Sequence, residues 1–155
     1  MRKRDREIQD INKIIKILKD SDRLVLAFNG VEYPYMLPVN AGVERLDETI
    51  VLYFHGAKEG KKYDYLMDGV KVSFEADTDL ELVTDFKKGY CTMNYSCVIG
   101  WGEVQEIKDY EDKERALQVI VDSYHIDDGF VYNRGALDRT AVFKIIVKEI
   151  RGKTK

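Results

Sequence analysis

The chain has 155 residues and a mass of 18.0 kDa, the size of a single domain that can bury its own core. Its 25 Lys and Arg against 28 Asp and Glu give a net charge of −3, which excludes the broad basic surface of a nucleic-acid-binding protein but not a local phosphate site. With 45% hydrophobic and 34% charged residues, the composition also excludes a disordered or membrane-embedded chain.

The first predicted element is an amphipathic helix from about Arg6 to Lys19, ended by Ser21 and Asp22. Its apolar residues recur at helical spacing and form one stripe, with charged residues on the opposite face. The stripe contains Ile8, Ile11, Ile14, Ile15, Ile17 and Leu18. Lysines interrupt every apolar stretch that could form the core of a signal peptide, so we expect no secretion signal and a cytoplasmic location.

Short apolar runs separated by turn signals follow, a pattern typical of antiparallel strands. The predicted strands are Arg23–Phe28, Tyr35–Asn40, Val43–Leu46, Thr49–His55, Val70–Glu75, Leu80–Val83, Tyr95–Ile107 and Ala141–Ile150. Turns are expected at Asn29-Gly30, Asp47-Glu48 and Asp77-Thr78-Asp79, because these residues favour tight turns. Gly100 and Gly102 are the expected bulge points of the longest strand.

Two further helices are expected among these strands. Lys58–Met67 has the length of a short helix, and Asp109 is the expected N-cap of a longer one. The longer helix should bury Ala116, Leu117, Ile120, Val121 and Tyr124. Helices flanking six or more antiparallel strands predict an α+β fold with a barrel, and the lack of repeats and linkers predicts one domain over residues 1–155.

The segment Tyr53–Lys62 has the pattern of a phosphate-binding turn. An apolar strand ends at His55, and small residues then lead into a helix that carries Lys61 and Lys62. Free N–H groups at a helix start and closely approaching glycines favour an anion. Of the two lysines, Lys61 is expected to make the main contact and Lys62 to point elsewhere. The alternative is a plain strand–turn–helix with solvated lysines, and His55 itself could donate to a phosphate, carry a proton or simply pack.

A second candidate ligand contact lies in Tyr33–Asn40. Pro38 cannot donate to a neighbouring strand, so the strand can leave its ladder there and aim the N–H groups of Val39 and Asn40 at a ligand. The alternative is an edge strand that proline ends.

No metal or nucleophile motif is present. Cys91 and Cys97 are too few for a disulfide framework and are expected to be small buried residues, and the two histidines, His55 and His125, lie far apart in sequence. Gly100-Trp101-Gly102 lacks the third glycine of a dinucleotide fingerprint. The acidic residues from Asp77 to Asp85 are expected to be a solvated hairpin, so no metal site is predicted.

Taken in order, these stretches resemble the FMN-binding split-barrel proteins related to pyridoxamine 5′-phosphate oxidase, and among them the nitroimidazole-resistance (Nim-like) branch. The resemblance covers nearly the whole chain, and its most specific part is Phe54-His55-Gly56-Ala57-Lys58-Glu59-Gly60-Lys61. The other matching pieces are 1–8, 33–40, 91–102 and 137–145. The chain departs from the family at Asp68-Gly69-Val70, where an Asn-Pro pair is expected, and at Asn40-Ala41-Gly42, which lacks an aromatic residue.

The resemblance implies a six-stranded split barrel of Greek-key topology that forms a homodimer with flavin at the subunit interface. FMN, or alternatively FAD, would lie across the strand that ends at Asn40, with its phosphate at the turn after His55. The implied cofactor-binding residues are Leu37, Pro38, Val39, Asn40, Phe54, His55, Gly56, Ala57, Gly60, Lys61 and Lys62, joined by Tyr95, Ser96, Cys97 and Val98 of the second subunit.

The function implied is a flavin-dependent reductase or oxidoreductase with a small-molecule electron acceptor, nitroaromatic compounds such as 5-nitroimidazoles being candidates, and with His55 as the catalytic residue. Two alternatives remain open: a non-catalytic flavin-binding or electron-buffering protein, and a haem-binding split barrel with His55 or His125 as axial ligand. Nucleic acid and membrane partners are not expected. The substrate and the electron donor stay open.

Overall fold

The structure is a computed structural model and describes residues 4–124 and 129–155. In chain order its elements are β1 (Glu7–Ile8), α1 (Ile11–Asp20), β2 (Leu24–Phe28), β3 (Tyr35–Val39), β4 (Ala41–Leu46), β5 (Thr49–Ala57), β6 (Lys71–Asp85), β7 (Tyr90–Ile107), α2 (Tyr110–Asp122), α3 (Arg134–Arg139) and β8 (Thr140–Thr154), with 3₁₀ turns at Arg4–Arg6 and Lys61–Asp64. None of the helices in these two ranges has the length and apolar run needed to span a bilayer. His125, the alternative haem ligand, lies outside the described residues.

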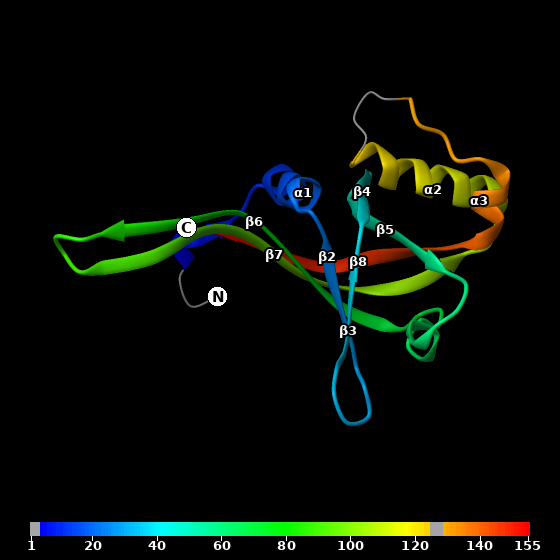
Figure 1. The fold of residues 1–155 in the computed structure, drawn as a ribbon, viewed down its shortest axis with the longest axis horizontal. Helices are drawn as coiled ribbons and strands as arrows, with labels where there is room; N and C mark the ends of the chain where they lie inside the picture. The colour runs from blue at the N-terminus through cyan, green and yellow to red at the C-terminus, as the bar shows by residue number, and fades with distance from the viewer. Residues whose placement is uncertain (1–3, 125–128) are drawn as a thin grey trace.

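The strands form one antiparallel, eight-stranded sheet in the order β3-β2-β6-β7-β8-β5-β4, with β1 paired to β8 (Figure 1). The two edge strands of this path, β3 and β4, are consecutive in the chain, and the single residue Asn40 joins them. The sheet therefore curls into a barrel that stays split between its edges. The predicted α+β split barrel is confirmed, with eight strands in place of six.

The interior of the barrel holds the main core. β5 and β8 alternate so that Leu52 and Phe54 point inward, against Phe143 and Ile145. The residues between them point outward, where Tyr53 packs under α2. α1 buries Ile14, Ile17 and Leu18 against the interior residues of the barrel. Apolar side chains thus alternate between the two faces of these strands, one face forming the barrel core and the other packing under α2.

The first helix is shorter than its apolar stripe predicts. It begins at Ile11, where the Asp10 carboxylate accepts a hydrogen bond from Asn12 N–H at 2.9 Å and caps the helix. Ile8 belongs to β1 and pairs with Gly152. Ile8 fits a helical and an extended pattern equally well, so pairing with a distant strand decides its state.

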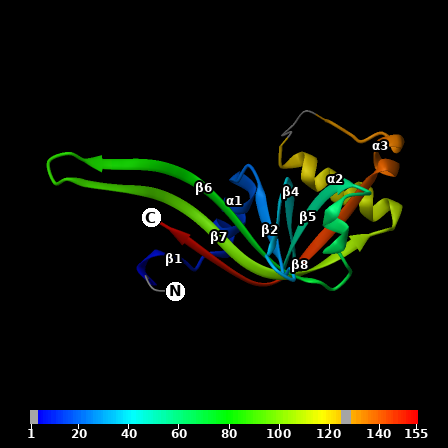
Figure 2. The same cartoon turned by 60° about the horizontal axis from the view of Figure 1, so that its bottom comes forward.

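The turn predicted at Asp77-Thr78-Asp79 is wrong. β6 runs straight through it, and the extra residues are absorbed as an irregularity between Thr78 and Glu81, with Asp79 at φ 58°. Asp tolerates this left-handed conformation, so a turn-like sequence can form a bulge. β6 and β7 continue as a two-stranded arm, the segment from Asp79 to Tyr95, which projects from the barrel (Figures 1 and 2).

Three smaller expectations also differ. The helix expected at Lys58–Met67 is only the 3₁₀ turn Lys61–Asp64, and α3 was not foreseen. Tyr124 lies just beyond α2, partly exposed, where its hydroxyl bridges Ala41 N–H and the Asp22 carbonyl at 3.3 Å each. Cys91 is exposed on the arm and Cys97 is only partly buried, whereas burial of both was expected.

Candidate ligand-binding cavity

A cavity of about 280 Å³ lies at the split of the barrel, where β3 and β5 face each other. It brings together the two stretches that the sequence singled out, although they lie on separate strands that do not pair. Its lining residues are Leu37, Pro38, Val39, Asn40, Phe54, His55, Gly56, Lys62 and Phe143. All of these except Phe143 were among the predicted cofactor-binding residues.

The inner wall of the cavity is apolar and flat. The rings of Phe54 and Phe143 stack with centroids 5.1 Å apart and planes 16° from parallel. Leu37 and Val39 pack against the same core from β3. Apolar surfaces of this kind accept a planar aromatic ligand, because burial of its faces is favourable without any polar partner.

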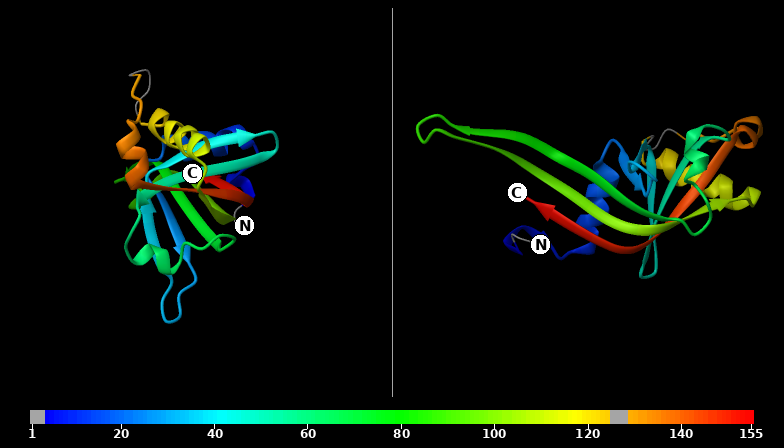
Figure 3. Two further views of the ribbon diagram at one scale, coloured as in Figure 1. Left: turned by 90° about the vertical axis from the view of Figure 1, so that its right-hand side faces the viewer. Right: turned by 90° about the horizontal axis from the view of Figure 1, so that it is seen from below.

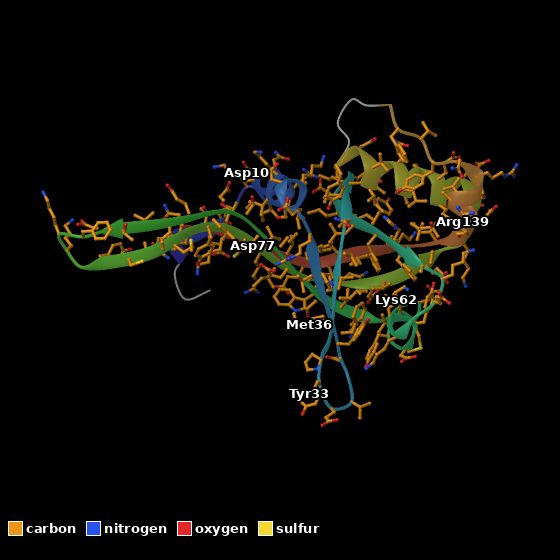
Figure 4. All side chains as sticks on the ribbon, viewed as in Figure 1. Asp10, Tyr33, Met36, Lys62, Asp77 and Arg139 are labelled. Carbon is orange, nitrogen blue, oxygen red and sulfur yellow. The ribbon has the colours of Figure 1, made fainter. Side chains whose placement is uncertain are left out.

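The polar end of the cavity is formed by Gly56 and Lys62, the latter labelled in Figure 4. A Cβ placed on Gly56 would lie 3.2 Å from Lys62 Cε, so the absence of a side chain lets the lysine fold over the strand. Lys62 Nζ donates to the Glu59 carbonyl and lies 5.0 Å from the Tyr63 ring centroid. These contacts hold one cation at the mouth of the cavity.

The two lysines are placed in the reverse of the expected order. Lys62 lines the cavity, whereas Lys61 is exposed and, like Ala57 and Gly60, is not part of its lining. A 3₁₀ turn rotates each residue by about 120°, against about 100° in an α-helix, so the face that each lysine occupies changes. A turn of four residues also has little dipole, which leaves the Lys62 ammonium as the main attraction for an anion.

His55 is next to Gly56 on the cavity wall. Partial burial lowers the pKa of His55 from its ordinary value of 6.5, so the imidazole is mostly neutral at pH 7 even though much of the ring meets solvent. Within the described residues no side chain or backbone group forms a hydrogen bond with this ring. Both ring nitrogens are therefore available to a ligand, one as donor and one as acceptor.

β3 supplies the opposite wall. Among the strands of residues 4–124 and 129–155 it pairs only with β2, so alternate N–H groups of β3 point away from that neighbour, and Pro38 has none to offer. The Asn40 side chain is used elsewhere, since its Nδ2 donates to the Asp22 carbonyl at 3.3 Å. Asn40 therefore fixes the corner of the barrel and offers the cavity its backbone.

The predicted residues Tyr95 to Val98 lie on β7 and are not part of this cavity. Ser96 is buried and its hydroxyl lies 3.1 Å from Thr154 Oγ1, and Val98 is fully buried. Only Tyr95 and Cys97 turn their side chains toward the outward face. Contact between these residues and a ligand in the cavity would require a second chain.

A second cavity, about 400 Å³, lies on the opposite side of β5, beside Tyr53, Lys144 and Arg115. Tyr53 donates to Glu44 at 2.8 Å, and Arg115 holds both oxygens of Glu44 at 2.8 and 3.0 Å. Burial, and then the bond to Glu44, raise the pKa of Tyr53 to about 12. These three groups satisfy one another, so they fasten α2 to β4 and β5.

Comparison with known proteins places these features in a family. Residues 10–154 match the family described as pyridoxamine 5′-phosphate oxidase. A solved structure of a candidate 5-nitroimidazole antibiotic resistance protein from Bacteroides thetaiotaomicron is 28% identical, with a TM-score of 0.80 over 96% of this chain and 86% of that one.

Two more distant structures share the fold. An FAD- and haem-binding protein from Mycobacterium smegmatis is 14% identical, with a TM-score of 0.79 over 97% of this chain and 73% of that one. A flavocytochrome from Azotobacter vinelandii is 18% identical, with a TM-score of 0.75 over 99% and 72%. No curated protein sequence matches the chain significantly.

Proposed function

Because the chain belongs to the pyridoxamine 5′-phosphate oxidase family, we propose that it binds a flavin, FMN in the first place, in the cavity between β3 and β5. The observation that carries this proposal is the composition of the cavity: a flat apolar wall, a neutral imidazole and one held cation within a single lining. FMN has a planar apolar ring system and one phosphate, so it needs both ends of this cavity.

Each end has residues that fit the cofactor. Leu37, Val39 and Phe54 would hold the ring system, and the backbone of β3 would donate to its polar edge. Lys62 would bind the phosphate, since a glycine at position 56 leaves the space that the lysine stem uses. FAD has the same ring and phosphate, and the FAD-binding relatives of this fold support it as the alternative.

The active unit in this proposal is a homodimer. The cavity of one chain, about 280 Å³, is at or below the size of typical small-molecule sites, which span about 300–1,000 Å³. A second subunit that covers its open side would enlarge and enclose the site. Residues of the outward face of β7 are the proposed contribution of the partner, Tyr95 and Cys97 first.

The proposed activity is reduction of a small-molecule acceptor, with nitroaromatic compounds as the first candidates. The similarity to the candidate nitroimidazole resistance protein supports this substrate class. A bound flavin supplies the electrons, and His55 would hold a proton beside the acceptor because its neutral ring can both accept and donate. A protein that binds flavin without turnover is the alternative, and it shares every binding residue.

Spectroscopy of the purified protein tests the cofactor directly. Flavin absorption bands with FMN identified by mass spectrometry are expected, whereas a Soret band would assign the haem alternative. Reduction by a nicotinamide donor and then turnover of a 5-nitroimidazole would establish the reductase. A flavin that is reduced but never reoxidised by any acceptor would leave electron buffering as the function.

The two lysines make a matched pair of variants for the phosphate. Lys62→Ala should weaken FMN binding about tenfold to a hundredfold, the effect of losing one charge-assisted contact of about 1.5–3 kcal/mol. Lys61→Ala removes an equal charge outside the lining and should change affinity far less. Equal losses in fluorescence titrations of both variants would contradict this placement of the phosphate.

A further inference from the structure

A pair of stacked tyrosines joins the two walls of the split. Tyr35 is the first residue of β3, and Tyr65 follows the 3₁₀ turn Lys61–Asp64. Their ring centroids lie 4.4 Å apart and their planes are 6° from parallel. No strand pairing among residues 4–124 and 129–155 joins β3 to β5 or to this turn. The aromatic contact therefore connects two segments that the backbone leaves unconnected.

The tyrosine pair and the cavity share one face of β3. Side chains alternate along this strand, so Tyr35, Leu37 and Val39 point to the same side and are partly buried, whereas Met36, labelled in Figure 4, is 62% exposed. Leu37 and Val39 line the cavity, which ends at Asn40. The Asn40 link and the Tyr35 ring thus lie at opposite ends of the β3 wall.

Beyond Tyr35 the chain has little support. The pair Phe28–Tyr35 is the last one between β2 and β3, and Tyr33 is 74% exposed. In Figures 1 and 3 the loop between these strands projects from the barrel. Phe28 itself is buried and lies 6.3 Å from the Tyr35 ring and 6.4 Å from the Tyr65 ring. Tyr35 is therefore the last residue of β3 that contacts the barrel at this end.

The other partner, Tyr65, is firmly anchored. The N–H groups of Tyr65 and Leu66 both donate to the Lys62 carbonyl, at 3.0 and 2.9 Å. Leu66 is buried, and Gly69 N–H donates to the Val104 carbonyl of β7 at 2.8 Å. The Tyr65 ring thus has the same support as Lys62, the cation at the mouth of the cavity. A contact with Tyr65 places β3 relative to that cation.

The rings and not the hydroxyls make this contact. Neither the Tyr35 nor the Tyr65 hydroxyl forms a hydrogen bond within the described ranges. Stacked aromatic rings attract each other beyond the effect of the area that they bury. Phenylalanine can therefore replace either tyrosine and keep the pair, whereas alanine removes it.

We propose that the Tyr35–Tyr65 pair, here called the latch, sets the width of the cavity and controls entry and release of the flavin. When the rings separate, β3 can swing about Asn40, because its cavity edge has no hydrogen-bonded neighbour in the described chain. When they stack, the β3 backbone and Lys62 are held at the separation that one cofactor needs at both of its ends. The inference rests on the proposed function and names positioning residues for that site.

The rate of flavin release tests the latch. Tyr65→Ala removes the stack, so bound FMN should dissociate about threefold to tenfold faster, measured as recovery of free FMN fluorescence after dilution. Tyr65→Phe keeps the ring and should release FMN at the wild-type rate. Tyr132→Ala is the matched control, because it removes an aromatic contact with Phe130, at 5.3 Å, outside the cavity lining. Equal acceleration in this control, or none in Tyr65→Ala, would overturn the proposal.

A double-variant cycle tests whether the two rings act together. Tyr35→Ala changes the opposite wall and should accelerate release as much as Tyr65→Ala does. The double variant should release FMN no faster than either single one, because the contact is already lost. Accelerations that multiply would show that the rings act separately, and would refute the latch.

Hydrogen exchange of flavin-free protein separates this inference from the proposed function. In Tyr65→Ala, the amides of β3 that pair with β2 should exchange faster, while those between β5 and β8 keep their rates. This result in a protein that binds no flavin would keep the latch and refute the cofactor. Unchanged exchange of β3 in a protein that binds FMN would refute the latch and keep the cofactor.

Discussion

The two halves of β7 have the same neighbouring strand on one side, but only one half has a neighbouring strand on the other side. Both halves pair with β6, from Tyr90 to Glu103. From Ser96 onward β8 pairs on the second side and the inward residues are buried, whereas no residue of the arm half is buried. Pairing with one neighbouring strand is thus enough to form a strand, but pairing with a second one decides whether that strand contributes to the core.

The largest expected effect compares one residue type in the two regions. Phe74 on β6 is 1% exposed in the barrel, and Phe86 at the end of the arm is 93% exposed. Phe74→Ala should lower the free energy of unfolding by about 3–5 kcal/mol because it leaves a cavity. Phe86→Ala should change it by less than about 0.5 kcal/mol. Urea denaturation measures both, and similar losses would show that the arm is part of the cooperative core.

This contrast between barrel and arm was only half predictable from sequence. Alternation and turn residues located Leu24–Phe28, Tyr35–Val39 and Thr49–Ala57 nearly to their ends, since these strands have local signals. Asp77-Thr78-Asp79 has the local signal of a turn as well, yet pairing of Glu81 with Asn94 extends the strand beyond it. A bulge and a turn use the same residues, and only the distant partner distinguishes them.

The candidate site shows the same division. Leu37–Asn40 and Phe54–Gly56 were predictable because single residues in them are local signals: Pro38 interrupts strand pairing, and His55 and Gly56 mark the turn after a strand. Phe143 was not, because it enters the cavity through its pairing with Phe54 on another strand. The choice between Lys61 and Lys62 depended on the type of helix, which four residues do not specify.

A second, smaller effect sharpens the comparison at Gly100. A Cβ at this position of β7 would lie 2.2 Å from Phe74 Cζ, so Gly100→Ala should destabilise the protein by about 1–3 kcal/mol through overpacking. The double variant Gly100→Ala/Phe74→Leu should lose less than the sum of its single changes, since the smaller side chain leaves room. Strictly additive losses in thermal denaturation would mean that no close contact exists there.

The smallest expected effect is the pH dependence of stability that His55 contributes. It is expected in the barrel and not in the arm, because a pKa shift by desolvation requires burial. The folded pKa of His55 is below its unfolded value of 6.5, so the unfolded chain binds more protons between these two values. Stability from this residue is complete above pH 6.5 and is lost as the pH falls through the folded pKa. His55→Gln should reduce the drop in the unfolding midpoint between about pH 7.5 and about pH 5. An unchanged drop would show that His55 titrates normally.

The single-residue link at Asn40 has a consequence for how the cavity opens. The two edges of the sheet are tied at that point and separate beyond it, so the gap is a wedge with its hinge at one end. Gly42, two residues beyond the hinge, lets α2 pack directly on β4, since a Cβ there would meet the backbone of Val119 and Ile120 at 2.7–2.8 Å. Substitutions along the wedge, at Leu37 or Phe54, can then change which molecule fits while the angle between the walls stays fixed. Substitution at Gly42 would instead force α2 and β4 apart next to the hinge, from which both walls of the cavity start.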